Sequence, residues 1–138
     1  MKPHSFTFIK QFHRNPPGPN IFTRAAHVQR AYDHYRLDVA AKKYPSLRHK
    51  IFHTAPMTPY VLRPNDFPYN VEPDVEHKVL WLNPTLFIPY TFDPSEPLIE
   101  QILESEFQNR PFVFFRNTKE VSSVFDMIHY QVFTPRTT

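Results

Sequence analysis

The stretch DPSEPLIEQILESEF, residues 93–107, predicts a helix placed between two runs of strand-forming residues. Asp93 as N-cap, Pro94 at the first helical position and Glu96 three residues after the cap match a capping box. The apolar residues recur at helical spacing, so we expect one side of the helix to be buried. That buried stripe comprises Leu98, Ile99, Ile102, Leu103 and Phe107.

Short runs rich in β-branched and aromatic residues lie on both sides of this helix and predict strands. They are VLR at 61–63, HKVLWL at 77–82, PFVFF at 111–115 and MIHYQVF at 127–133. Together with the helices, these runs predict an α+β fold, a small, mostly antiparallel sheet of about four strands covered by two main helices.

The other main helix is predicted from Thr23, as its N-cap, to about Lys43, and Pro45 closes it. One face of this helix carries Val28, Tyr32, Tyr35 and Val39. The segment SLRHKIFH, residues 46–53, predicts a further short helix.

Residues 1–22 are predicted to form an extended, proline-rich tail or clamp that lies on a single domain, residues 23–138. Within this segment the run HRNPPGPN, residues 13–20, holds three prolines and the only glycine, which disfavour regular structure. No internal repeat or low-complexity segment divides the rest of the chain.

Composition narrows the class of protein. Of 138 residues, 14 are Phe and 7 are Tyr, which argues for a packed core of large rings rather than disorder. Cysteine is absent, which excludes disulfides, Cys-ligated zinc and thiol chemistry and favours an intracellular, cytoplasmic location. No signal peptide or membrane-spanning run is evident, so we expect a soluble protein. The net charge of +3 allows nucleic-acid binding without implying it.

The stretch LRPNDFPYNVEPDVEHKVLW, residues 62–81, concentrates polar and aromatic side chains. The pair Asn65-Asp66 after a proline is typical of a turn, and turn formation accounts for both residues without a ligand. Arg63 offers a planar fork for carboxylate or phosphate, and Tyr69 offers a hydroxyl.

A second group of candidate residues comes from three different predicted strands. His77 begins one predicted strand and can exchange a proton near neutral pH, although a lone strand histidine is more often structural. His129 lies inside another strand, and Asn117 ends a third. If the two histidines share a face, they could serve as acid and base in phosphodiester chemistry, or one could attack a phosphorus centre.

The resulting hypothesis places His77 and His129 as catalytic residues beside a site for an anionic or sugar-like small molecule. The predicted ligand-binding residues are Arg63, Asn65, Asp66, Tyr69, Trp81 and Asn117. No metal site or cofactor is predicted, because His49 and His53 lack the glutamate of a zinc-binding HExxH motif. The alternative is a non-enzymatic interaction subunit, whose proline-rich termini dock on a larger assembly. Whether the protein is an enzyme stays open between these two hypotheses.

The segments RPNDFPY, HKVLW and RPFVFFRN, followed by a serine and an Asp-x-x-His-x-x-Val-Phe ending, resemble the N-acetylglucosamine-induced protein family. This family comprises uncharacterised proteins of fungi and of large DNA viruses, and the resemblance covers about residues 24–133. The family pattern ends in His-x-His-Val-Phe, whereas this chain has Gln131 at the second histidine. The same ending is also similar to the histidine-triad nucleotide hydrolases, but the Gly-rich context of those enzymes is missing. The resemblance implies no settled activity.

Overall fold

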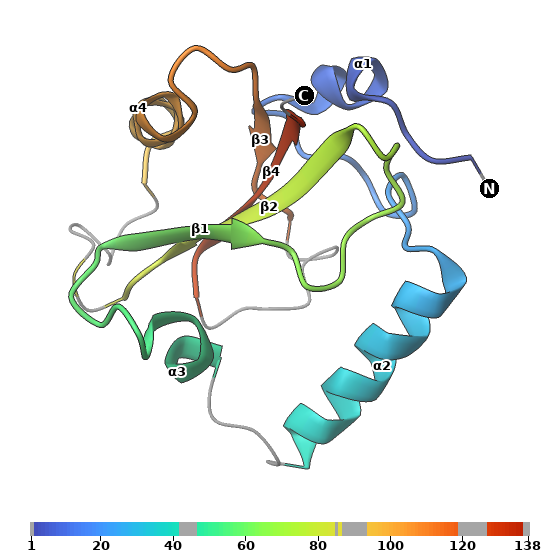
Figure 1. Cartoon of the computed structure of the whole chain (residues 1–138), viewed down its shortest axis with the longest axis horizontal. Helices are drawn as coiled ribbons and strands as arrows, with labels where there is room; N and C mark the ends of the chain where they lie inside the picture. The colour runs from blue at the N-terminus through green and yellow to red at the C-terminus, as the bar shows by residue number, and fades with distance from the viewer. Residues whose placement is uncertain (1, 42–46, 85, 87–93, 119–126, 137–138) are drawn as a thin grey trace.

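The computed structural model of the protein describes residues 2–41, 47–84, 86, 94–118 and 127–136, and Figure 1 shows the arrangement of its elements. The predicted α+β class is confirmed. In chain order the elements are α1 (Phe6–Ile9), the 3-10 helix η1 (Lys10–Phe12), α2 (Ala26–Ala40), α3 (Leu47–Phe52), β1 (Tyr60–Pro64), β2 (Val75–Leu82), α4 (Glu96–Phe107), β3 (Val113–Phe115) and β4 (His129–Pro135).

The four strands form one antiparallel sheet in the order β1-β2-β4-β3. In the central pair, β2 and β4, His77 lies opposite Phe133 and Trp81 lies opposite His129. Successive side chains of a strand point to opposite faces. The even-numbered residues of β2 and β4 therefore share one face of the sheet, and the odd-numbered residues share the other. The predicted small antiparallel sheet of four strands is confirmed.

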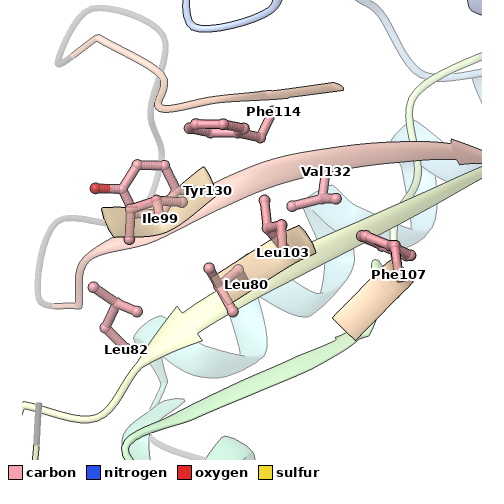
Figure 2. Close-up of a cluster of buried hydrophobic side chains, with 8 residues drawn as sticks. All are labelled: Leu80, Leu82, Ile99, Leu103, Phe107, Phe114, Tyr130 and Val132. Atoms are coloured by element: carbon pink, nitrogen blue, oxygen red, sulfur yellow. The ribbon is translucent and has the colours of Figure 1, made fainter. Parts of the chain in front are cut away.

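The even-numbered face is covered by α4 (Figure 2), whose apolar stripe was predicted from helical spacing. Ile99 and Leu103 are fully buried, and Phe107 is nearly so. These side chains pack against Leu80, Leu82, Phe114, Tyr130 and Val132. The position of the predicted capping box is wrong, because the helix begins at Glu96 and its N-cap is Ser95. The Ser95 hydroxyl accepts a hydrogen bond from the Leu98 N–H at 3.3 Å, so it does what Asp93 was expected to do. Asp93 lies outside the described residues.

The odd-numbered face carries two apolar clusters with polar side chains between them. The first cluster contains Ile9, Tyr69, Val75, Val113, Phe115 and Phe133. The second cluster contains Ile51, Phe52, Val79, Trp81 and Met127. His77 and Gln131 lie along the strands between the two clusters, and both are buried. The buried polar pair is therefore enclosed by hydrophobic packing on two sides.

The N-terminal segment covers the first of these clusters and is helical in part. The prediction of an extended conformation is wrong for α1 and η1. The Ser5 hydroxyl accepts a hydrogen bond from the Phe8 N–H at 3.1 Å and so caps α1, and Ile9 is buried completely in the core. The complete burial of Ile9 stabilises this helical turn, which lies between Pro3 and the prolines of residues 13–20.

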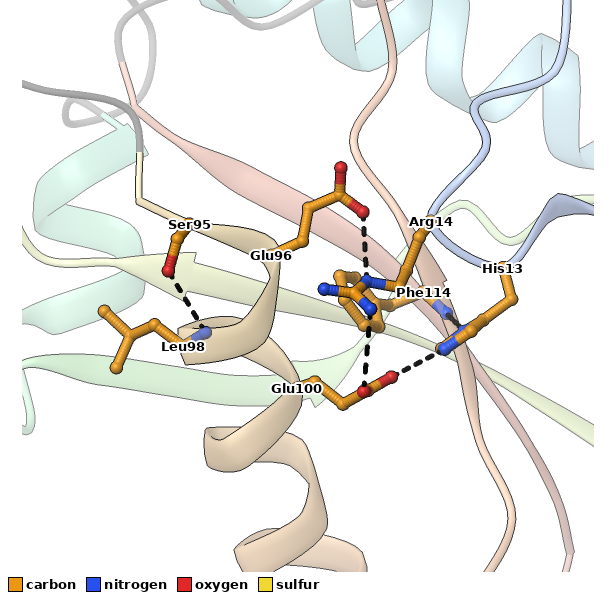
Figure 3. A network of polar contacts seen from close by, with 7 residues as sticks. All are labelled: His13, Arg14, Ser95, Glu96, Leu98, Glu100 and Phe114. Carbon is orange, nitrogen blue, oxygen red and sulfur yellow. Dashed lines mark hydrogen bonds and ion pairs between the residues drawn. The ribbon is translucent and has the colours of Figure 1, made fainter.

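Beyond η1 the same segment is attached to the edge strand β3 and to α4 (Figure 3). The Arg14 N–H donates to the Phe114 carbonyl at 2.7 Å, and His13 Nδ1 accepts from the Phe114 N–H at 3.3 Å. His13 Nε2 lies 2.7 Å from a Glu100 oxygen, and Arg14 Nε lies 3.1 Å from Glu96. The segment thus covers part of a sheet edge that would otherwise present unpaired backbone groups.

The long helix α2 differs from its prediction in two ways. It begins at Ala26 with Ala25, not Thr23, as its N-cap. The Thr23 carbonyl accepts a hydrogen bond from the Asn70 N–H, which ties the chain before the helix to the segment after the Asn65 turn. Its predicted apolar face is only half-buried at Tyr32 and Tyr35, and α2 lies to one side of the sheet in Figure 1. The sheet face opposite α4 is instead covered by the N-terminal segment and α3.

Candidate functional site

The turn after β1 forms as its Asn-Asp pair predicted. The Asn65 side-chain oxygen accepts a hydrogen bond from the Phe67 N–H at 2.7 Å, which closes an Asx turn. The Asn65 N–H donates to the His77 carbonyl at 2.9 Å and so extends the pairing of β1 with β2. The turn places the chain that follows, including Tyr69, over the odd-numbered face of the sheet.

His77 is hydrogen-bonded through both ring nitrogens. Nδ1 accepts a hydrogen bond from the Tyr69 N–H at 3.0 Å, so the ring proton of the neutral form resides on Nε2. Nε2 lies 2.6 Å from the side-chain oxygen of Gln131, to which it donates. The Asn65 amide also donates to that oxygen, at 3.4 Å. His77 therefore links β2, β4 and the turn, and its tautomer is set by its partners.

Burial keeps His77 uncharged. Loss of solvation lowers its pKa to about 3; the bond to Gln131 opposes this shift, and the charge of Arg24 adds to it. A general base must accept a proton at an atom that the substrate can reach. In His77 one nitrogen is occupied by a backbone N–H and the other already carries a proton, so this geometry fits a structural role. Its catalytic role stays a prediction.

His129 and His77 share the odd-numbered face but do not meet. His129 lies opposite Trp81, four residues along β2 from His77, which corresponds to about 13 Å at the usual rise per strand residue. The His129 ring stacks on the Trp81 indole with centroids 4.8 Å apart, and its Nδ1 lies 3.1 Å from the Met127 carbonyl. The structure therefore does not bring the two histidines into hydrogen-bond reach. Trp81 itself is part of the buried core.

Arg63 and Asp66 lie at the more exposed rim of the turn. Arg63 Nη2 is 3.5 Å from one Asp66 oxygen, and Lys50 Nζ is 3.1 Å from the other. Both side chains of the predicted pair are thus engaged with charged neighbours, although pairs this exposed contribute little to stability.

Tyr69 is the residue around which the remaining predicted residues gather. Its ring is buried and stacks on Phe22, with centroids 5.5 Å apart, and its pKa is raised by that burial. The Asn117 amide nitrogen donates to the Tyr69 hydroxyl at 3.0 Å. The Asn117 side-chain oxygen is also buried, yet it accepts no hydrogen bond from the part of the chain that the structure describes. Buried acceptors of this kind are uncommon in folded proteins.

Arg24 was not among the predicted site residues, but the structure places it beside Tyr69. Its guanidinium carbon lies 4.1 Å from the centroid of the Tyr32 ring and 5.2 Å from that of Tyr69. Its Nε donates to the Phe67 carbonyl at 2.7 Å. Its two terminal nitrogens have no acceptor among the described residues. Sequence reasoning assigned Arg24 only to the start of a helix, since nothing local indicated that it would meet Tyr69, 45 positions later.

The predicted site is therefore partly assembled. Asn65, Tyr69, His77 and Asn117 are linked by hydrogen bonds or ring contacts, while Arg63 and Asp66 lie at the rim and Trp81 and His129 form a separate stack. The residues that sequence reasoning did not place in the site are Phe22, Arg24, Tyr32, Phe67 and Gln131.

The described residues include no group of three or more His, Asp or Glu side chains placed to hold a metal ion. His49 and His53 lie one helical turn apart in the sequence, and their rings stack with centroids 5.2 Å apart. In the same part of the chain, the helices fall short of the length and apolar character needed to cross a bilayer.

Residues 19–134 match a protein family described as "Protein of unknown function (DUF3605)". The chain belongs to this family. The match includes every residue of the predicted site together with Arg24, and the description assigns no activity. A search among curated proteins found no match.

The fold is also found in a solved structure described as "Crystal Structure of HTC1". The two chains superpose with a TM-score of 0.60 over 97% of this DUF3605 chain and 86% of the other, and they share 20% sequence identity. At this level of identity the likeness shows a common fold and nothing about activity.

Proposed function

We propose that this DUF3605 protein binds a small anionic or sugar-like molecule at a site formed by Arg24, Tyr32, Tyr69 and Asn117, called here the Tyr69 site. The observation that carries the proposal is the guanidinium of Arg24, which lies against two tyrosine rings with both terminal nitrogens unpaired by the described residues. We also infer that DUF3605 corresponds to the N-acetylglucosamine-induced protein family, because residues 24–133 carry that resemblance and lie within the matched range.

The surroundings of Arg24 favour anion binding. The bond from Nε to the Phe67 carbonyl and the stacking on Tyr32 hold the plane of the guanidinium in place. An arginine fixed in this way loses less side-chain entropy when it binds, and its remaining N–H groups match the geometry of carboxylate and phosphate oxygens. No carboxylate of the described residues occupies this position.

The other side of Tyr69 favours a hydroxylated ligand. The buried oxygen of Asn117 can accept a hydrogen bond from a ligand hydroxyl, while the amide nitrogen of Asn117 stays on Tyr69. His77 stabilises this site indirectly, because its hydrogen bond with the Tyr69 N–H holds the backbone that carries the tyrosine ring. In the proposed function His77 positions Tyr69 and exchanges no proton.

The proposal can be tested by measuring melting temperature and binding heat with glucuronate, inorganic phosphate and glucose as probes. Arg24→Gln should weaken binding of an anionic probe by about tenfold or more, because a hydrogen bond to a charged group contributes roughly 1.5–3 kcal/mol. Arg30→Gln is the matched control, since Arg30 is exposed on the adjacent helix α2 and makes no ion pair with described residues. Probe binding that is absent from the parent protein, or equal in both variants, would contradict the proposal.

A second candidate function is an interaction subunit, and the exposure of α2 favours it. Leu37 is 70% exposed and Val39 is 44% exposed, so two apolar side chains of this helix face solvent. They lie two positions apart, on different sides of the helix, so each is a separate contact point for a partner. A chain that stays monomeric at high concentration in sedimentation velocity, and behaves identically after Leu37→Ser, would count against this function.

A further inference from the structure

The positive charge around Tyr32 comes from two arginines. Arg24 lies over this ring at 4.1 Å, and the guanidinium carbon of Arg36, one helical turn after Tyr32, lies 5.6 Å from the same centroid. Arg36 makes no ion pair with the described residues. Both cations thus lie beside one aromatic ring, and neither makes an ion pair with the described residues.

Several other charged side chains of the described residues are paired elsewhere. Arg14, Arg63 and Arg110 each contact a carboxylate. On α2 itself, Asp33 accepts a hydrogen bond from Gln29 at 2.9 Å, and Asp38 lies 3.5 Å from His34. The acidic side chains nearest in sequence to Tyr32 therefore have partners other than the two arginines.

We propose that the Tyr69 site takes the phosphate group of a phosphate monoester, with Arg24 and Arg36 as its two cationic contacts. This inference rests on the proposed function and narrows its ligand class. A carboxylate has two oxygens in one plane, and a single bidentate arginine engages both of them. A phosphate monoester has three acceptor oxygens and carries close to two negative charges at neutral pH, so it can satisfy a second arginine as well.

The different burial of the two arginines suits different roles. Arg24 is half-buried and bonded to the Phe67 carbonyl, whereas Arg36 is exposed on the helix surface. Arg24 would fix the position of the phosphate, and Arg36 would close on it from the solvent side. The contact with Arg36 therefore distinguishes ligands by their net charge, because an exposed ion pair gains affinity chiefly from the number of charges that it brings together.

The experiment compares glucose 6-phosphate with glucose 6-sulfate, a tetrahedral ester that carries one negative charge, by calorimetry on the full-length chain at low salt. The parent protein should bind the phosphate about fivefold more tightly than the sulfate, the upper range for one exposed ion pair. Arg36→Gln should abolish that preference by weakening the phosphate alone. Arg24→Gln should weaken both esters, Arg24→Lys should restore part of the loss, and Arg30→Gln should change neither.

The outcomes separate this inference from the proposed function. If both esters bind equally and Arg36→Gln changes neither, while Arg24→Gln weakens both, the phosphate inference is overturned and the binding function stands. The same holds if glucuronate binds through Arg24 and glucose 6-phosphate does not bind. If no anionic probe binds the parent protein, both proposals are overturned. Because Arg36 is exposed, its variant is expected to fold and to report on binding alone.

Discussion

The packing around His77 favours a structural role for this side chain over a catalytic one. Its two ring nitrogens contact the Tyr69 backbone and the Gln131 side chain, and its ring stacks on Phe133 with centroids 4.4 Å apart. A second proton on the ring would displace the Tyr69 N–H and leave a charge away from water. The lowered pKa follows from these contacts, and His77 is held neutral in the folded protein.

A pH dependence of stability follows. On folding, the pKa of His77 falls from 6.5 to about 3, so between these values the unfolded chain binds more protons than the folded chain. The contribution of His77 is fully present above about pH 6.5 and is lost as the pH falls toward 3. From about pH 7 to about pH 4 the free energy of unfolding should decrease by about 3 kcal/mol through this residue. Urea unfolding at the two pH values measures the decrease.

The matched variant for this measurement is His77→Gln, whose amide can accept from Tyr69 and donate to Gln131 without titrating. The variant should lose less stability than the parent protein over the same pH range, by about the amount assigned to His77. Equal losses in the two proteins would show that the folded-state pKa of His77 is not lowered.

The helix α2 contacts the sheet domain through the aromatic side chain of Phe67. Phe67, at the turn after β1, lies between Tyr32 and Tyr35, with ring centroids 5.1 and 5.3 Å away. Lys50 of α3 adds a contact over the Tyr35 ring at 4.4 Å. Residues 26–39 of this helix have no fully buried side chain. The helix therefore depends on such contacts, because isolated helices of this length are only marginally stable in water.

Phe67→Ala should therefore loosen α2 and leave the sheet intact. We expect backbone amides of α2 to exchange with deuterium at least about tenfold faster, corresponding to a loss of about 1.4 kcal/mol or more in local stability. Amides of β2 and β4 should keep their protection. Leu37→Ala, at an exposed position of the same helix, is the control and should leave the exchange of α2 near that of the parent protein. Uniformly faster exchange across the domain after Phe67→Ala would argue against this separation.

The N-terminal segment contributes to stability through burial more than through charge. Ile9 is fully buried beside Phe115 and Phe133, whereas the pair Arg14–Glu96 is substantially exposed. Ile9→Ala should lower the free energy of unfolding by about 2–5 kcal/mol, the usual range for truncating a buried isoleucine. Glu96→Ala should lower it by less than about 1 kcal/mol. Chemical denaturation of both variants measures the difference, and a larger loss for Glu96→Ala would reverse the assignment.

Three apolar clusters lie on the two faces of one sheet, so we expect the described residues to unfold as one unit. One cluster joins Leu103 and other residues of α4 to the sheet, the cluster around Phe133 includes Ile9 of the N-terminal segment, and the cluster around Trp81 includes Ile51 and Phe52 of α3. Because β2 contributes side chains to all three clusters, loss of one face should destabilise the others.

One isoleucine in each cluster allows this unity to be measured. Ile99, Ile9 and Ile51 belong to the three clusters in turn. In urea titrations followed by NMR of labelled isoleucine methyl groups, the three unfolding midpoints should coincide, as expected for a two-state domain of this size. An Ile9 midpoint clearly below the other two would show that the N-terminal segment is released separately from residues 23–138.

Local sequence patterns accounted for much of the fold. Alternating apolar runs located the four strands, and helical spacing located the buried stripe of α4, because both signals depend on neighbours in sequence. Boundaries were less accurate. The cap of α4 moved to Ser95, since Asp93 and Ser95 can both satisfy the first N–H groups of a helix. The helix α2 begins after Ala25, which makes no side-chain cap bond, so no local signal marked its start.

The residues of the candidate site needed the tertiary structure, because contacts between distant segments create it. The sequence by itself located the turn at Asn65 and marked Tyr69, His77 and Asn117 as residues with chemical potential. It did not show that Gln131, 54 positions after His77, fixes the proton of that ring, or that Arg24 lies against Tyr69. Strand order and burial decided these two contacts, because they determine which side chains meet and which of them are removed from water. The lowered pKa of His77 follows from its removal from water.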